Sequence, residues 1–134
     1  MKCSKIKILI ISFFLLMIAV GAFAHEPSEM DVKYSAISGK LTITVYHKVN
    51  SITVHYINLI EVFLNRQGKE LEDRLIISQE FFSQPIRNEQ RAQYLVNDLY
   101  PGDKLKIVAY CNLFGKIEKT LTVSEDNWQE ISEP

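Results

Sequence analysis

Cysteine is scarce in this sequence. Of the two cysteines among 134 residues, Cys3 lies near the N-terminus and Cys111 lies in the last quarter of the chain. If the N-terminal segment is removed as a signal peptide, Cys111 stands alone and no disulfide can form within one chain. An unpaired thiol in an oxidising compartment is a hazard unless it is buried, paired with another chain or bound to a metal. Cys111 is therefore the first indication of chemistry.

The sequence also lacks the short motifs of several common enzyme classes. It has no Gly-rich phosphate-binding loop, no G-x-S-x-G elbow and no C-x-x-C pair. Internal repeats, low-complexity tracts and amphipathic helical patterns are missing as well. The residues that remain as candidates for chemistry are Cys111 and the three histidines, His25, His47 and His55.

The N-terminus has the three parts of a signal peptide. A basic start with three lysines is followed by an apolar run from Ile8 to Val20 and by the small-x-small pattern Ala22-Phe23-Ala24. The apolar run is shorter than the roughly 20 residues that a membrane-spanning helix needs, although an uncleaved anchor is the alternative. We therefore predict a cleavable signal peptide over 1–24 and an exported, periplasmic protein over 25–134.

Cleavage would change the charge of the chain. Removing the three signal lysines from 15 basic residues leaves 12 against 16 acidic residues, a net charge of −4. A negative charge argues against nucleic acid or an anionic membrane surface as a partner. No membrane association is expected after cleavage.

Two segments of the mature chain alternate apolar and polar residues with the period of a half-buried strand. In the segment that starts at Leu41, the alternation places His47 on the core side where the strand ends. In the segment from Lys104 to Tyr110, it places Cys111 in the same phase as the core set. Both residues are thus predicted to lie at strand ends and to face inward.

Other segments predict further strands. His55 to Leu64 is apolar on both faces, which indicates a central strand with Ile57, Leu59 and Phe63 on one face together with His55 and Glu61, or a helix as the alternative. Weaker strand patterns and one ordered loop complete the chain: strands near Met30 to Ala36, Leu71 to Ser78, Arg91 to Asn97 and Ile117 to Val123, and a loop from Gln79 to Gln90, with Trp128 docking from the tail. Six or seven short strands in one domain favour an all-β, immunoglobulin-like antiparallel β-sandwich.

The ends of three predicted strands carry metal-binding residue types. His47 ends one strand, His55 begins the next and Cys111 ends a third, and strand ends on one rim of a sandwich lie close together. Imidazole nitrogen and thiolate sulfur suit a first-row transition metal. Each residue also has a structural interpretation: Cys111 as a buried apolar residue, His55 as a polar cap and His47 as a hydrogen-bonded rim histidine.

Two segments resemble a known family. Leu99 to Asn112 reads L-Y-P-G-D-K-L-K-I-V-A-Y-C-N and resembles the L-x-P-G-D-K-L-K-V-V-A-Y-C-N-x-H-G signature of the superoxide reductase (desulfoferrodoxin) iron domain. His55 to Val62 reads H-Y-I-N-L-I-E-V and is similar to that family's H-Y-I-x-W-I-E-V segment. The resemblance covers the chain from about Leu41 to Val123. It implies an immunoglobulin-like sandwich with a non-haem iron, held by an axial cysteine thiolate and four histidines, that reduces superoxide to peroxide.

The match to the family's ligands is incomplete. Cys111 and His55 occupy ligand positions, but the histidine of C-N-x-H-G is replaced by Phe114 and the histidine six residues before His55 by Val49. His47 could substitute if the loop is reshaped. His25-Glu26-Pro27 is weakly similar to the family's early K-H-x-P segment. At most three histidines and Cys111 could therefore form the site, which argues against full activity.

Three functions follow as alternatives. The first is a superoxide-reductase-like iron protein with an incomplete ligand set, acting on superoxide with an electron-donor protein. The second is a non-catalytic exported binding or assembly module with Cys111 in its core. The third is a copper protein in which His25, as the new N-terminus, chelates Cu(II) through its amine and imidazole. Zinc, a site without metal and a homo-oligomer also stay open.

Overall fold

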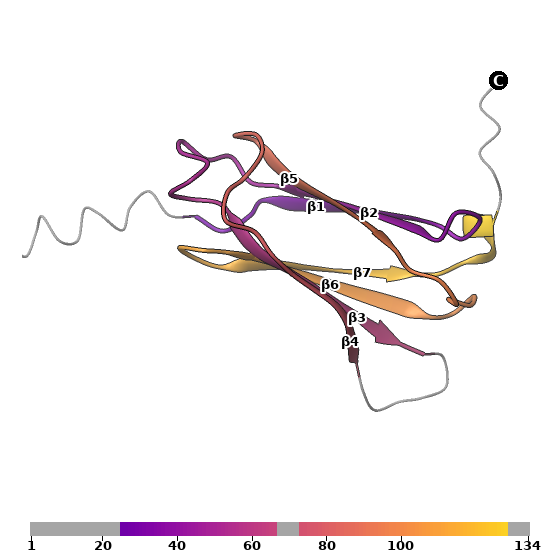
Figure 1. Ribbon diagram of the computed structural model, residues 1–134. Helices are drawn as coiled ribbons and strands as arrows, with labels where there is room; N and C mark the ends of the chain where they lie inside the picture. The colour runs from indigo at the N-terminus through magenta and orange to yellow at the C-terminus, as the bar shows by residue number, and fades with distance from the viewer. Residues whose placement is uncertain (1–24, 67–72, 129–134) are drawn as a thin grey trace, which may run out of the picture.

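The computed structural model describes residues 25–66 and 73–128 and folds them into seven strands and a short 3-10 helix (Figure 1). The elements are β1 (Glu29–Ser35), β2 (Lys40–Tyr46), β3 (Ile57–Asn65), β4 (Arg74–Glu80), β5 (Glu89–Leu95), β6 (Lys104–Cys111), β7 (Lys116–Thr122) and η2 (Glu125–Trp128). A three-stranded sheet in the order β1-β2-β5 faces a four-stranded sheet in the order β4-β3-β6-β7. All strand pairs are antiparallel, so the predicted β-sandwich is confirmed. No helix in these ranges has the length and apolar character needed to cross a membrane.

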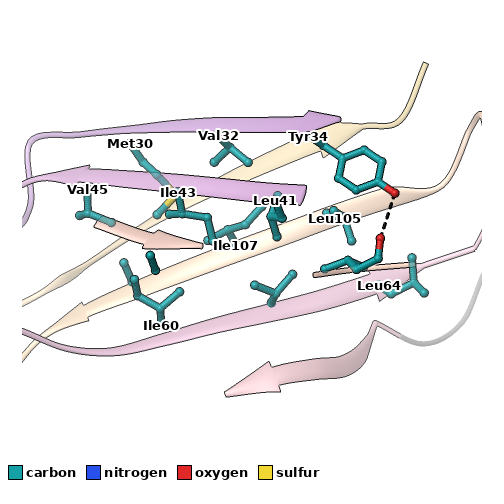
Figure 2. Packing of buried hydrophobic residues seen from close by; sticks show 14 of the residues in the cluster. Met30, Val32, Tyr34, Leu41, Ile43, Val45, Ile60, Leu64, Leu105 and Ile107 are labelled. Carbon is teal, nitrogen blue, oxygen red and sulfur yellow. Dashed lines mark hydrogen bonds between the residues drawn. The ribbon is translucent and has the colours of Figure 1, made fainter. Parts of the chain in front are cut away.

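The core lies between the two sheets and is built from alternate residues of each strand. The alternation predicted for β2 and β6 is confirmed, and Figure 2 shows their inward side chains packed against those of β1 and β3. The inward residues of β2 and β6 are fully buried: Leu41, Ile43, Val45, Leu105, Ile107 and Ala109. Burial of such side chains contributes roughly 1.5–3 kcal/mol each to folding, which fixes the sandwich that carries the strand ends.

The faces of β3 differ from the prediction. The strand starts at Ile57, two residues after His55, and its register with β6 shifts between Ile57 and Leu59. A bulge moves the residues on one side of it to the opposite face. Ile57 is therefore buried together with Ile60, whereas Leu59 and Glu61 are partly exposed. The predicted grouping of Ile57 with Leu59, and of Glu61 with the core set, is wrong.

The segment around the predicted loop 79–90 is more regular than expected. β4 continues to Glu80 and β5 begins at Glu89, so the loop is shorter by two residues at one end and two at the other. The start of the strand predicted at Leu71 and the docking of the Trp128 side chain lie outside the described residues. The predicted signal peptide over 1–24 also lies outside them.

Four chain segments meet at one end of the sandwich, on the left of Figure 1. The chain enters β1 there, leaves β2, enters β3 and leaves β6. His25, His47 and His55 lie on these connections, and we call this the histidine end. The β1–β2 and β5–β6 connections lie at the opposite end.

Candidate metal centre

The three histidines form a cluster at the histidine end. Each contributes a ring nitrogen, and these atoms all lie within 4.8 Å of one another. The ring centroids of His47 and His55 are 4.5 Å apart, and His25 lies 5.2 Å from His47 and 5.1 Å from His55. All three pairs meet edge to face, so ring edges, which carry the nitrogens, point toward neighbouring rings. We call His25, His47 and His55 the histidine cluster.

His47 lies immediately after β2 and has no exposed surface. Its Nδ1 is 3.2 Å from Oε1 of Gln84, and Nε2 of Gln84 donates to the carbonyl oxygens of His47 and Ile86, each at 2.8 Å. The two donations fix the orientation of the amide, so Oε1 accepts a hydrogen bond from Nδ1–H of His47. Nε2 of His47 is left without a proton, and its lone pair is available to a metal.

Gln84 was missed by sequence reasoning. It lies in the connection between β4 and β5, is completely buried, and its main-chain amide donates to the carbonyl of Ile52 at 2.9 Å. A buried glutamine that holds a histidine ring is the support a metal ligand usually has. No feature of the residue pattern singles it out, because it sits in a polar stretch with no periodicity.

His25 precedes β1, and its ring is exposed on one side. Its Nε2 is 2.8 Å from the carbonyl oxygen of Lys48, and its Nδ1 is 3.0 Å from the carbonyl oxygen of Glu26. The contact with Lys48 ties the first described residue to the chain beyond β2. The carbonyl oxygen of His25 is itself 3.4 Å from Nε2 of His47. Both the ring and the main chain of residue 25 thus belong to the site.

His55 and Cys111 are in direct contact. Nε2 of His55 is 3.1 Å from Sγ of Cys111, and the two residues are 7% and 9% exposed. Metal bonds of about 2.1 Å to nitrogen and about 2.3 Å to sulfur place two neighbouring ligand atoms about 3 Å apart when they meet at a right angle. The observed separation therefore fits two adjacent ligands of one metal ion.

The turn after β6 directs main-chain hydrogen bonds at the sulfur. The amides of Leu113 and Phe114 lie 3.4 Å and 3.5 Å from Sγ of Cys111. Gly115 closes the turn with a φ of +78°, and a Cβ at this position would lie 2.6 Å from Cβ of Glu26. Glycine is required here both for the backbone conformation and for the close approach of the segment that carries His25.

Asn112 joins the cysteine turn to the loop that carries His55. Its side-chain oxygen accepts from the amide of Tyr56 at 2.9 Å, and its side-chain amide donates to the carbonyl of Val54 at 3.0 Å. Its main-chain amide donates to Tyr56 at 3.0 Å. Sequence reasoning assigned no role to Asn112, although it follows the cysteine in the recognised segment. The three hydrogen bonds fix the distance between His55 and Cys111.

Burial keeps two of the imidazoles neutral. Desolvation lowers the pKa of His47 below its ordinary value, and the neighbouring rings of His55 and His25 add to this, against hydrogen bonds to Gln84 and to the His25 carbonyl. Desolvation followed by the charge of His25 lowers the pKa of His55 in the same direction. A neutral imidazole is the form that binds a metal.

The structure brings the predicted site residues His25, His47 and His55 together, despite the wider spacing of His47 from His55, and it places Cys111 in contact with His55. The two family positions that lack histidine differ from each other: Val49 is 3% exposed, while Phe114 is 60% exposed. Three nitrogens and one sulfur form a donor set suited to iron, copper or zinc. The service of these four residues as ligands stays a prediction.

Comparison with known proteins identifies structures of the same fold. No family model matches the chain, and no curated protein does. Among solved structures, the one-iron superoxide reductase from Giardia intestinalis is 25% identical with a TM-score of 0.57, over 74% of this chain and 100% of that one. A superoxide reductase in the oxidised state is 20% identical with a TM-score of 0.57, over 75% and 90%. The superoxide reductase (neelaredoxin) from Archaeoglobus fulgidus in the reduced form is 19% identical with a TM-score of 0.51, over 78% and 93%.

The matches cover about three quarters of this chain and nine tenths or more of each solved chain. They agree with the two recognised segments, which contribute His55 and Cys111 to the site. The chain has the immunoglobulin-like β-sandwich fold of the superoxide reductases, and the predicted resemblance to that family is confirmed.

Proposed function

We propose that this chain is an exported metal-binding protein of superoxide reductase type, whose centre takes a non-haem iron between the histidine cluster and Cys111. The contact between His55 and Cys111 carries the proposal. Two groups that both bind transition metals lie 3.1 Å apart, inside a sandwich whose fold is that of the superoxide reductases. The adjacent rings of His25 and His47 supply two more nitrogens.

The residues of the chain prepare this site in three ways. Burial holds His47 and His55 in the neutral form. Gln84 fixes the ring of His47 so that Nε2 faces the cluster. The amides of Leu113 and Phe114 point at Sγ of Cys111, and hydrogen bonds to a metal-bound sulfur tune the reduction potential of the centre.

Iron, when bound, would supply the one-electron chemistry that converts superoxide and two protons into hydrogen peroxide, with the electron delivered by a donor protein. The chain's part is to admit a small anion and exclude bulk water from the buried side. The exposed ring of His25 marks the open side of the cluster, while His47, His55 and Cys111 lie on the buried side.

Metal content tests the proposal directly. Mature protein is purified without oxygen, loaded with Fe(II) and compared with a Cys111→Ser variant. We expect near-stoichiometric iron and, after oxidation, a thiolate-to-iron absorption band that is lost in the variant. Superoxide consumption by the loaded protein would then be measured with a chemical reductant. If the mature protein retains no more iron than the Cys111→Ser variant does, the proposal is wrong.

A second candidate function is docking to another protein. Several large apolar side chains are exposed on the connections at the histidine end: Val54, Phe82, Ile86, Leu113 and Phe114. Exposed apolar side chains that form one contiguous patch mark interaction sites. The partner would be an electron donor if the first proposal holds, or an assembly partner if the sandwich is a non-catalytic module. A Phe82→Ser variant should lose the partner and keep its metal, whereas Cys111→Ser should do the reverse.

A further inference from the structure

The main chain of residue 25 lies among the imidazoles of the site. Its carbonyl oxygen is 3.4 Å from Nε2 of His47. The α-nitrogen of the same residue is three bonds from this oxygen. A metal held by the histidine cluster would therefore have a main-chain atom of residue 25 beside it as well as the ring.

The ring of His25 is oriented for chelation with its own main chain. A neutral imidazole donates from one nitrogen only, and the shorter of the two contacts joins Nε2 to the Lys48 carbonyl at 2.8 Å. In the tautomer that donates from Nε2, Nδ1 is an acceptor that faces a second acceptor, the carbonyl oxygen of Glu26, at 3.0 Å. A cation bound at Nδ1 removes this mismatch. Nδ1 and the α-nitrogen of one histidine close a six-membered chelate ring around a metal.

The segment that carries His25 is held in place. The amide of Ser28 donates to the carbonyl of Tyr46 at 2.9 Å, Pro27 is buried, and Glu26 packs against the glycine turn at Gly115. Together with the contact between His25 and Lys48, these interactions fix residue 25 from both sides. A ligand at this position would be preorganised, which lowers the entropy cost of binding a metal.

We propose that the α-amino group of His25, released by signal peptidase, is a fourth nitrogen ligand of the metal centre, next to Nδ1 of the same residue. This inference rests on the proposed function and names how the centre is completed. Hydrolysis of the Ala24–His25 amide consumes one water and leaves a carboxylate on Ala24 and an amine on His25. The amide nitrogen of the precursor has no basic lone pair, whereas the amine has one. The four nitrogens are then three imidazoles and this amine, with Cys111 as the sulfur.

Metal binding at the complete site then depends on removal of the signal peptide during export. A precursor with an intact Ala24–His25 bond holds three imidazole nitrogens and the thiol, and it lacks the chelate at His25. Metal acquisition would then occur where the signal peptide is removed. The same residue would also close the open side of the cluster, because His25 is its exposed member.

Two proteins that differ by a single residue test the proposal. One begins at His25, the other retains Ala24, and all side chains of the described domain are identical. Fe(II) and Co(II) affinities are measured by competition with a chelator, and the visible spectrum of the Co(II) form reports the ligand set. Thermal unfolding of the metal-free proteins shows whether the extra residue disturbs the fold.

We expect the protein that retains Ala24 to bind Co(II) at least about tenfold more weakly, with shifted ligand-field bands, an unchanged thiolate charge-transfer band and an unchanged unfolding midpoint. Equal affinity with an identical spectrum would overturn the proposal and leave the proposed function intact. Failure of both proteins to bind metal would overturn both. Mass spectrometry of exported protein must also give His25 as the first residue, and any other N-terminus contradicts the proposal.

Discussion

The two ends of the sandwich both bury polar groups, but they do so differently. At the opposite end, the carboxylate of Asp103 is almost completely buried and accepts hydrogen bonds from Nη1 of Arg66 at 3.1 Å and from the amide of Tyr100 at 2.9 Å. Arg66 also donates to the carbonyl of Asp98, and the main chain of Asp103 pairs with that of Val123. Each of these groups has a partner of opposite hydrogen-bonding character.

At the histidine end, groups of the same character face one another. Nε2 of His47 and the carbonyl oxygen of His25 lie 3.4 Å apart in a partly buried position, and both are acceptors once Gln84 has fixed the ring of His47. Buried polar groups without complementary partners cost free energy. Buried groups with complementary partners therefore stabilise the fold, whereas acceptors that face one another can bind a cation.

Removal of one imidazole should have the largest effect of these substitutions, and the effect should be confined to metal binding. We expect His55→Leu to weaken Co(II) binding at least about 100-fold, because the substitution deletes a proposed ligand. Leucine fills a similar volume, so the free energy of unfolding of the metal-free protein should change by less than about 1.5 kcal/mol. Chelator competition and urea unfolding measure the two quantities. Val54→Ala, an exposed neighbour, serves as control and should alter neither.

Substitution of a buried polar residue at the opposite end should lower stability and leave metal binding unchanged. Asp103→Ala removes an acceptor from Arg66 and from the Tyr100 amide, and we expect a loss of about 2–3 kcal/mol in the free energy of unfolding with metal affinity unchanged. Asp103→Asn keeps the shape and one acceptor, so it should lose less. A fall in Co(II) affinity for Asp103→Ala at a temperature where the protein stays folded would contradict the separation of the two ends.

Gln84 supports both the fold and the metal site, and two substitutions can separate these roles. Gln84→Met removes the acceptor for His47 and both donations to carbonyl groups, so metal affinity should fall about 10- to 100-fold and stability should fall as well. Gln84→Glu keeps an acceptor for Nδ1–H of His47 but loses the donations to His47 and Ile86. We expect Gln84→Glu to keep most of the metal affinity while losing stability. Equal affinities for the two variants would show that the ring of His47 does not need this partner.

The stability of the metal-free protein should depend on pH through the histidine cluster. Burial lowers the folded-state pKa of His47 and His55 below the unfolded value of about 6.5, so the unfolded chain binds protons first as pH falls. Their contribution is fully present above about pH 6.5 and is lost as pH falls toward the folded-state pKa. Urea unfolding from pH 7.5 to 5.5 should show this decline, and His55→Leu should make it shallower. A decline of equal slope in His55→Leu would assign it to other groups.

The sequence predicted the strands whose pattern is regular and failed where the backbone departs from a period of two. β2 alternates throughout and β6 keeps the same inward set although Val108 on its other face is also buried, so the inward positions of His47 and Cys111 followed from counting. β3 carries a bulge after Ile57, and no residue pattern marks it because both faces are apolar. The site shows the same limit: strand ends placed His47, His55 and Cys111 on one rim, whereas Gln84 and the Asn112 bridge depend on loop conformations that periodicity does not describe.

His25 illustrates how a resemblance and a structure complement each other. Its spacing to β1 departs from the family pattern, so sequence alone left its place in the site open. The structure places it through contacts with Lys48 and through the glycine turn at Gly115, which lie 23 and 90 positions along the chain. Contacts between segments so far apart follow from the topology of the sandwich, in which β1 starts where β6 ends.

The smallest effect is expected for a substitution that adds an imidazole at the histidine end. Phe114→His restores the histidine of the C-N-x-H-G signature at a position where the present side chain is 60% exposed, so stability should change by no more than about 0.5 kcal/mol. If the amine of His25 already completes the four nitrogens, the added imidazole should change the Co(II) affinity of mature protein little. In the protein that retains Ala24, the same substitution should recover most of the lost affinity. A large gain in mature protein and none in the longer one would instead mean that the fourth nitrogen is missing after cleavage, and that the centre is open there to an imidazole.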